Sequence, residues 1–161
     1  MAISKSQSAL EYLMIIGITL GILVPTSYLF FRYSSESTVK IVYSQISQIG
    51  RSIMDTAETV YFSGEGAKIV LEVNMPKEVD DINIIARREL VFKIISQIGA
   101  TESVFFSSSS VPIISDDPSA GCTVNGNCGL SGIAGIGLKK IKIEAINDGG
   151  VIRVRISKFQ G

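Results

Sequence analysis

The stretch Gln7-Ser8-Ala9-Leu10-Glu11-Tyr12-Leu13 joins a short N-terminal segment to a long apolar run. Apart from Glu11, the run from Leu10 to Phe31 carries no charged side chain, and Arg32 follows it. These 22 residues would form a helix about 33 Å long at about 1.5 Å per residue, enough to cross the hydrocarbon core of a bilayer. The sequence therefore predicts a membrane-spanning helix.

Glu11 needs an explanation, because a carboxylate in the middle of a membrane costs about 2.5–3.5 kcal/mol. One interpretation is that Glu11 lies near the membrane edge and reaches water. The other is that it has a positively charged partner. A cut between Ser6 and Gln7 would place a new α-ammonium group four residues before Glu11, which is one helical turn away.

This junction resembles the class III signal peptide of archaeal type IV pilin-like proteins, in which a prepilin peptidase cuts before the apolar stretch. The resemblance rests on Gln7 after the cut, on the small polar Ser8, on Glu11 as the fifth mature residue, and on the apolar helix that follows. The residue before the cut is usually Gly or Ala in that family and is Ser6 here.

The resemblance implies a leader of residues 1–6, a cytosolic N-terminus and an exported head. It also implies that the chain is a major or minor subunit of a surface filament. Its partners would be the prepilin peptidase, the membrane and other copies of itself or related pilins.

Two other interpretations of the N-terminus stay open. A conventional secretory signal needs an apolar core of about 7–15 residues and a small-x-small cleavage site, whereas this core is longer and Pro25 to Phe31 offer no such site. An uncleaved signal anchor would instead give a membrane-anchored extracellular binding domain that does not polymerise.

The spacing of Gly17, Gly21 and Pro25 leaves one face of the apolar helix thin enough for a second helix to approach closely. Pro25 also removes one backbone hydrogen bond and should bend or loosen the helix. In pilin filaments the corresponding region packs subunit against subunit. The resemblance thus implies an assembly surface made of Gln7, Glu11, Gly17, Gly21 and Pro25.

Residues 7–33 are predicted to form the transmembrane or filament-core helix, and residues 34–62 an amphipathic continuation of it. Apolar residues recur at three- and four-residue steps along the continuation and predict one apolar face, namely Val39, Val42, Ile46, Ile49, Ile53, Ala57 and Val60. Polar residues alternate with them on the opposite side, namely Lys40, Ser44, Gln48, Arg51, Asp55 and Glu58. Glycines at 64 and 66 should end the helix.

Residues 63–161, the head, have a β-rich pattern. We expect strands at 68–75, 82–85, 90–95 and 104–106, an irregular excursion over 107–137, and a hairpin of 140–146 and 152–156 around the turn 147–150. Isoleucines and a valine of this hairpin should face the core, and its charged residues should face water or a partner. The expected fold class is α+β: a long helix packed on a small antiparallel β-sheet head, as in type IV pilins.

The only two cysteines, Cys122 and Cys128, flank a Gly/Asn turn. In an exported domain this spacing predicts a small disulfide loop, with two free thiols as the alternative. A zinc site is not expected, because two thiolates without any histidine cannot complete a tetrahedral shell.

No pattern in the chain points to catalysis, so we expect no enzyme activity and no cofactor. Histidine, the usual acid or base near neutral pH, is absent. The 15 basic residues balance 15 acidic ones, so the chain has no net positive charge that would attract nucleic acid. The pairs Asp80-Asp81 and Asp116-Asp117 are typical of solvated turns, with a calcium site at the second pair as a minor alternative. The glycines of 129–137 lack the GK[ST] ending of a phosphate loop.

Overall fold

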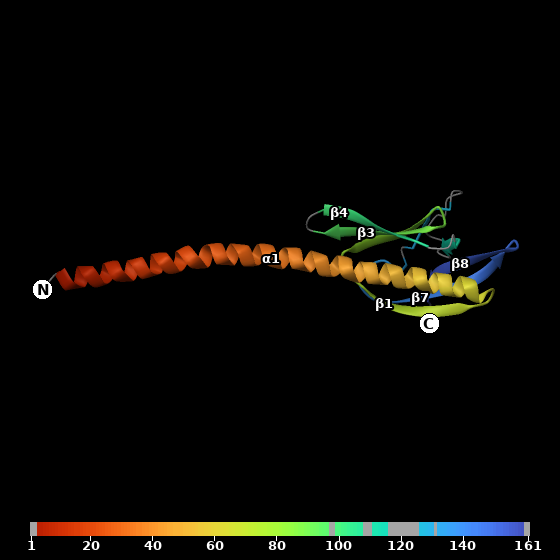
Figure 1. The fold of residues 1–161 in the computed structure, drawn as a ribbon, viewed down its shortest axis with the longest axis horizontal. Coiled ribbons are helices and arrows are strands. Elements are labelled where there is room, and N and C mark those ends of the chain that lie inside the picture. The colour runs from red at the N-terminus through yellow and green to blue at the C-terminus, as the bar shows by residue number, and fades with distance from the viewer. Residues whose placement is uncertain (1–2, 97–98, 108–110, 116–125, 131, 160–161) are drawn as a thin grey trace. The chain divides into compact units, whose positions relative to one another are not determined.

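The computed structural model describes residues 3–96, 99–107, 111–115, 126–130 and 132–159, but not the side chains of residues 3–8 and 35–38. Within these ranges one long helix is followed by a series of strands (Figure 1). The chain divides into two compact units, Met1–Ile41 and Val42–Gly161. The first unit is helical, and the second, the head unit, holds the last part of the helix and every described strand.

The helix α1 spans Ile3–Ser63 and contains Pro25 without an interruption in its assignment. Both predicted helical segments, 7–33 and 34–62, are therefore confirmed as helix, and residues 3–6 of the predicted leader are helical as well. α1 ends before Gly64, whose φ of +90° suits a residue without a Cβ. The Gly64 amide donates a hydrogen bond to the Tyr61 carbonyl at 3.2 Å.

The predicted apolar face of the continuation is confirmed. Ile46, Ile49, Ile53, Ala57 and Val60 are buried, and Val39 and Val42 are half-buried. Every predicted polar position is exposed except Glu58, which is half-buried and accepts a hydrogen bond from the Ser107 hydroxyl at 3.2 Å. Met54 also joins the core, although the three- and four-residue steps did not select it.

The described strands form two four-stranded sheets, with the orders β1-β7-β8-β5 and β4-β3-β2-β6. All pairs are antiparallel except β5 and β8, which are parallel. The α+β class is thus confirmed, but the expectation of one small antiparallel sheet is wrong. The strand bounds are β1 Lys68–Met75, β2 Val79–Ile85, β3 Glu89–Ser96, β4 Gly99–Phe106, β5 Ile113–Ser115, β6 Cys128–Gly129, β7 Gly137–Asp148 and β8 Val151–Lys158.

The predicted last hairpin is present, and the predicted strands 82–85 and 90–95 belong to a second hairpin, β2 with β3. β2 and β3 pair around a turn in which Ala86 and Arg87 have positive φ, at +51° and +60°. The last hairpin is longer than expected, because Gly149 and Gly150 alone make its turn and leave Asn147 and Asp148 in β7. Ile141, Ile143, Val154 and Ile156 are fully buried, as predicted, and the half-buried Ile152 packs against the core, whereas the half-buried Ile146 does not belong to it.

Two predictions in the middle of the head are wrong. β4 begins at Gly99, five residues before the expected strand, because pairing with β3 holds a largely exposed stretch extended. The excursion 107–137 is not wholly irregular. Its short segments β5 and β6 become strands by pairing with β8 and β2, which lie far away in the sequence.

The sheets approach each other where β5 contacts β2 and β6. Along the edge strands β1 and β4, the last part of α1 lies between the two sheets (Figure 1). On the β4 side, Gly50 lies against the ring of Phe105, and the Tyr43 hydroxyl is hydrogen-bonded to that of Thr101. One core therefore joins the helix to both sheets, with Phe92, Ile46 and Ile53 among its most buried side chains.

Candidate functional site

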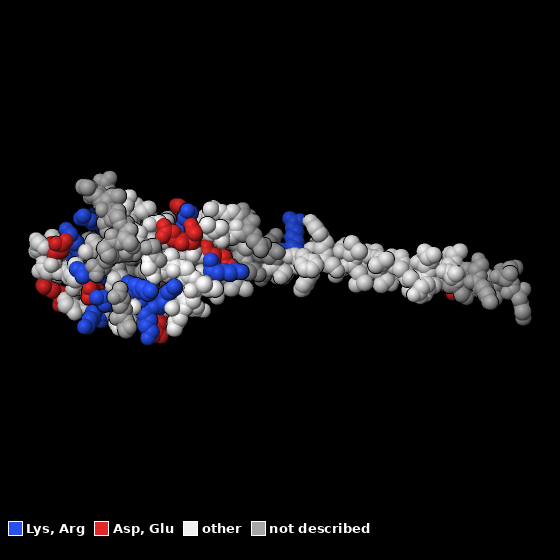
Figure 2. All heavy atoms as spheres, turned by 180° about the vertical axis from the view of Figure 1, so that it is seen from behind, with Lys and Arg blue, Asp and Glu red and all other residues white. Residues whose placement is uncertain are grey.

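The first candidate site is the apolar segment of α1, whose described side chains from Ala9 to Ser34 are all exposed. Leu13 is 73% exposed and Phe31 is 71% exposed. By length and composition this helix could cross a membrane, and the part of it that meets this test is not buried within the chain. Figure 2 shows the described part of the segment almost entirely white, whereas blue and red side chains are scattered among white ones over the visible face of the head.

Two hydroxyl groups within the apolar segment form hydrogen bonds with main-chain carbonyl groups of the same helix. Thr19 and Thr26 each donate a hydrogen bond of 2.7 Å to the carbonyl four residues earlier, that of Ile15 and of Ile22. A hydroxyl bonded in this way needs no water, which suits a hydrocarbon environment.

Glu11 lies in the exposed apolar segment, where it is the only charged residue between Ala9 and Phe31. Ser6 and Gln7 lie in α1, but their side chains are outside the described part of the structure. A helical backbone from Ile3 onward places Gln7 one turn before Glu11. The pairing of Glu11 with an ammonium group stays a prediction.

Within the part of the chain that the structure describes, nothing requires glycine at positions 17 and 21. A Cβ at either position would meet nothing within 4 Å, and neither glycine has positive φ. Gly50 is different, because a Cβ there would overlap the ring of Phe105. The two glycines near Pro25 thus leave room that the described chain does not fill.

Aromatic residues gather at the end of the apolar run, where the sequence pattern predicted no role for them. Tyr28, Phe30, Phe31 and Tyr33 are 66–76% exposed, next to Arg32. Aromatic side chains with a neighbouring cation are typical of a membrane–water interface. Four aromatic residues within six positions were the signal in the sequence that could have indicated this.

Cys128 begins β6 and is buried, at 6% exposure, beside its register partner Ile84 in β2. The neighbouring Asn127 accepts a hydrogen bond through its side-chain oxygen from the Ala86 amide at 3.0 Å. Cys122 lies outside the described residues, so the Cys122–Cys128 bond stays a prediction.

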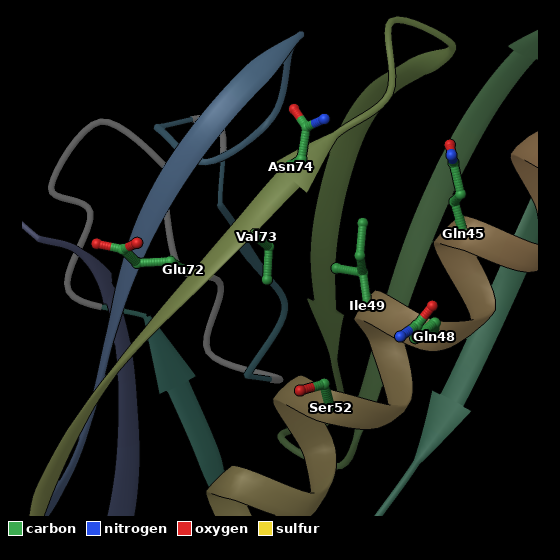
Figure 3. Close-up of a pocket in the computed structure, with 7 residues that line it drawn as sticks. All are labelled: Gln45, Gln48, Ile49, Ser52, Glu72, Val73 and Asn74. Carbon is green, nitrogen blue, oxygen red and sulfur yellow. The ribbon is translucent and has the colours of Figure 1, made fainter.

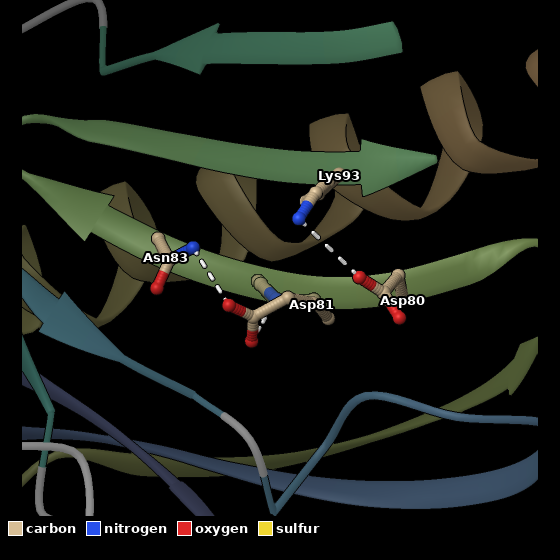
Figure 4. A network of polar contacts seen from close by, with 5 residues as sticks. Asp80, Asp81, Asn83 and Lys93 are labelled. Carbon is tan, nitrogen blue, oxygen red and sulfur yellow. Dashed lines mark hydrogen bonds and ion pairs between the residues drawn. The ribbon is translucent and has the colours of Figure 1, made fainter. Parts of the chain in front are cut away.

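The acidic pair Asp80-Asp81 lies in β2, at a break in its register with β3, so the prediction of a turn is wrong. Asp80 is 3.5 Å from the Lys93 ammonium group, and Asp81 accepts a hydrogen bond of 3.0 Å from the Asn83 side chain (Figure 4). The pair Asp116-Asp117 lies outside the described residues. Among the described residues, no three His, Cys, Asp or Glu side chains group together in a way that could hold a metal ion.

Basic side chains on the outer face of the last hairpin pair with acidic ones. Lys142 and Arg155 lie 3.1 and 3.5 Å from the same Glu144 carboxylate oxygen. Lys140 lies 2.9 Å from a carboxylate oxygen of Glu72, and Arg153 pairs with Asp148. Neighbouring acidic side chains thus neutralise much of the positive charge of this face.

A pocket of about 300 Å³ opens in the head unit between α1 and β1. Its helix wall is made of Gln45, Gln48, Ile49 and Ser52, and its strand wall is made of residues 72–74 (Figure 3). The sequence pattern placed Gln48 on the polar side of this helix and Ile49 on its apolar face, but it predicted no pocket, because Gln and Ser on an amphipathic helix have the pattern of an ordinary solvated face.

No protein-family model, curated protein or solved structure significantly matches this chain.

Proposed function

We propose that this chain is a structural subunit, a major or minor pilin, of an archaeal type IV pilus-like surface filament. A prepilin peptidase removes residues 1–6, and the subunit waits in the cell membrane with its N-terminus in the cytosol and its head outside. It then assembles with other copies of itself or related pilins through the N-terminal helix. Its work is assembly and surface display rather than catalysis.

The observation that carries this proposal is an apolar helical segment whose described side chains are exposed, followed along the same helix by residues that belong to the core of the head. All described side chains from Ala9 to Ser34 are exposed, whereas Ile46, Ile53 and Val60 are buried. Covering that segment requires either lipid or the same segment of other copies. A filament subunit needs both in turn, lipid before assembly and neighbouring helices after it.

Two details favour helix–helix packing over lipid alone. Gly17 and Gly21 present open space on the helix surface, which permits the close approach of a second backbone. Glu11 is a charge that lipid does not compensate, and the mature N-terminus of a neighbouring subunit would supply the opposite charge.

The test is to shear the cells that express the chain natively and to separate extracellular filaments from membranes. We expect the processed chain in the sheared filament fraction. If the chain occurs only in the membrane fraction, under conditions in which the cells carry filaments, it is a membrane-anchored extracellular domain that does not polymerise.

A further inference from the structure

The pocket between α1 and β1 exposes main-chain groups of an edge strand. β1 pairs with β7 on one side only, because it is the first strand in its sheet. At the start of the ladder, the Ala145 amide donates a hydrogen bond to the Ala67 carbonyl at 2.8 Å, and the Ala145 carbonyl accepts one from the Gly66 amide at 3.1 Å, so the Ala67 carbonyl lies on the β7 side of the strand. Hydrogen-bonded and non-bonded pairs alternate in an antiparallel ladder.

The same register continues along β1 as Ile69↔Ile143, Leu71↔Ile141 and Val73↔Lys139. The main-chain N–H and C=O groups of these odd-numbered residues therefore point toward β7. The main-chain N–H and C=O groups of Glu72 and Asn74 therefore point away from β7, and they lie in the strand wall of the pocket. In the described part of the chain, no hydrogen bond to these groups is present.

The helix wall opposite is formed by Gln45, Gln48 and Ser52, at the spacing of one helix face. The described structure shows no hydrogen bond that these three side chains donate or accept. Ile49 and Val73, both at least 90% buried, form an apolar floor. Figure 3 shows Val73 on the helix side of β1 and Glu72 extending to the other side.

Charge does not determine which ligand this pocket binds. The Glu72 carboxylate is paired with Lys140 at 2.9 Å, and the rest of the pocket lining is uncharged. The pocket can form hydrogen bonds through main-chain N–H and C=O groups on the strand wall and through side-chain amides on the helix wall. An extended peptide is the ligand whose two edges complement both walls, since each edge carries alternating donors and acceptors.

We propose that this pocket is a binding site for an extended peptide segment of another protein, which adds to β1 as a strand. The main-chain groups of Glu72 and Asn74 bind one edge of the peptide. Gln45 and Gln48 bind its other edge, and small side chains fit over the floor of Ile49 and Val73. This site lies in the head unit, outside the apolar segment of α1 that is proposed for filament assembly.

The test uses the full chain in detergent micelles and a capped Ser-Thr-Val-Thr-Ser peptide, followed by NMR titration of backbone and side-chain amides. We expect saturable shifts at the amides of Glu72, Asn74 and Gln48. For so short a peptide we expect a Kd in the millimolar range, on the order of −4 kcal/mol.

Asn74→Pro is the decisive variant, because its missing N–H faces the pocket rather than β7 and edge strands tolerate proline in that orientation. We expect Asn74→Pro to abolish binding and Asn74→Ala, which keeps the N–H, to retain it. Gln45→Leu and Gln48→Leu should each weaken binding several-fold, and Ser44→Ala on the exposed face of α1 should not. Unchanged NMR spectra away from β1 show that each variant is folded.

Three outcomes would overturn the proposal. The first is the absence of saturable shifts in the unmodified chain. The second is equal binding by folded Asn74→Pro and Asn74→Ala. The third is equal binding of the peptide after its backbone nitrogens are methylated, since that would exclude strand addition. A neutral sugar that shifts the Gln45 and Gln48 amides when the peptide does not would assign the pocket to a saccharide instead.

Discussion

The ring of Phe105 on β4 lies so close to the Cα of Gly50 on α1 that a Cβ at position 50 would overlap the ring carbons. Phe105 in turn meets the fully buried Phe92 edge to face, with ring centroids 5.5 Å apart. The absence of a side chain at Gly50 thus sets how closely the helix approaches one of the two sheets.

Gly50→Ala should lower the free energy of unfolding of the head. Overpacking costs about 1–3 kcal/mol, and the better helix propensity of alanine returns about 1 kcal/mol. We expect a net loss of about 1 kcal/mol, measured by chemical unfolding in detergent. Ser44→Ala on the exposed face is the control, and Phe105→Leu in the Gly50→Ala background should restore stability. An unfolding midpoint for Gly50→Ala at or above that of the unmodified chain would contradict the packing argument.

The mature protein should begin at Gln7. Intact-mass measurement or N-terminal sequencing of the chain from its native cells checks this. Ser6→Gly, which restores a residue usual before the cut in pilin-like proteins, should be processed at least as completely. A mature chain that retains Met1 to Ser6 would remove the basis of the filament proposal.

Glu11→Gln should leave the head folded and membrane insertion intact, because an amide is less costly in lipid than a carboxylate. Assembly should fail or slow, since removing one partner of a buried charge pair costs about 3–5 kcal/mol. That corresponds to more than two powers of ten in an association constant, at about 1.4 kcal/mol per tenfold. The measurement is filament yield at matched membrane levels.

Asp55→Asn is the control for Glu11→Gln, because it removes an exposed carboxylate from the same helix within the head unit. Its filament yield should equal that of the unmodified chain. Equal yields for Glu11→Gln as well would mean that Glu11 only reaches water at the membrane edge, and would favour the non-polymerising anchor.

Cys122 and Cys128 should be bonded in the exported protein. Mass spectrometry without reduction should find the chain two hydrogens lighter than its reduced form. Reduction should then cost about 2 kcal/mol of stability, the entropic value for so short a loop. Full alkylation of both thiols before any reduction would refute the bond.

The sequence by itself determined the elements whose pattern is local. The apolar run around Glu11 predicted a membrane-spanning helix, and the structure has a helix there. The three- and four-residue steps from Val39 to Val60 predicted the face that the structure buries fully or in part. The alternation in the last hairpin predicted which side chains face the core. Each of these signals arises from neighbours along the chain, so no knowledge of distant contacts was needed.

Only the tertiary structure decided how the strands divide into two sheets and what lies between them. β5 and β6 are three and two residues long, too short to show a period, and they are strands because β8 and β2 pair with them. The pocket likewise depends on position, since Gln48 and Asn74 have the pattern of solvated residues. They become a candidate site because α1 runs beside the free edge of β1, where main-chain hydrogen-bonding groups have no neighbouring strand.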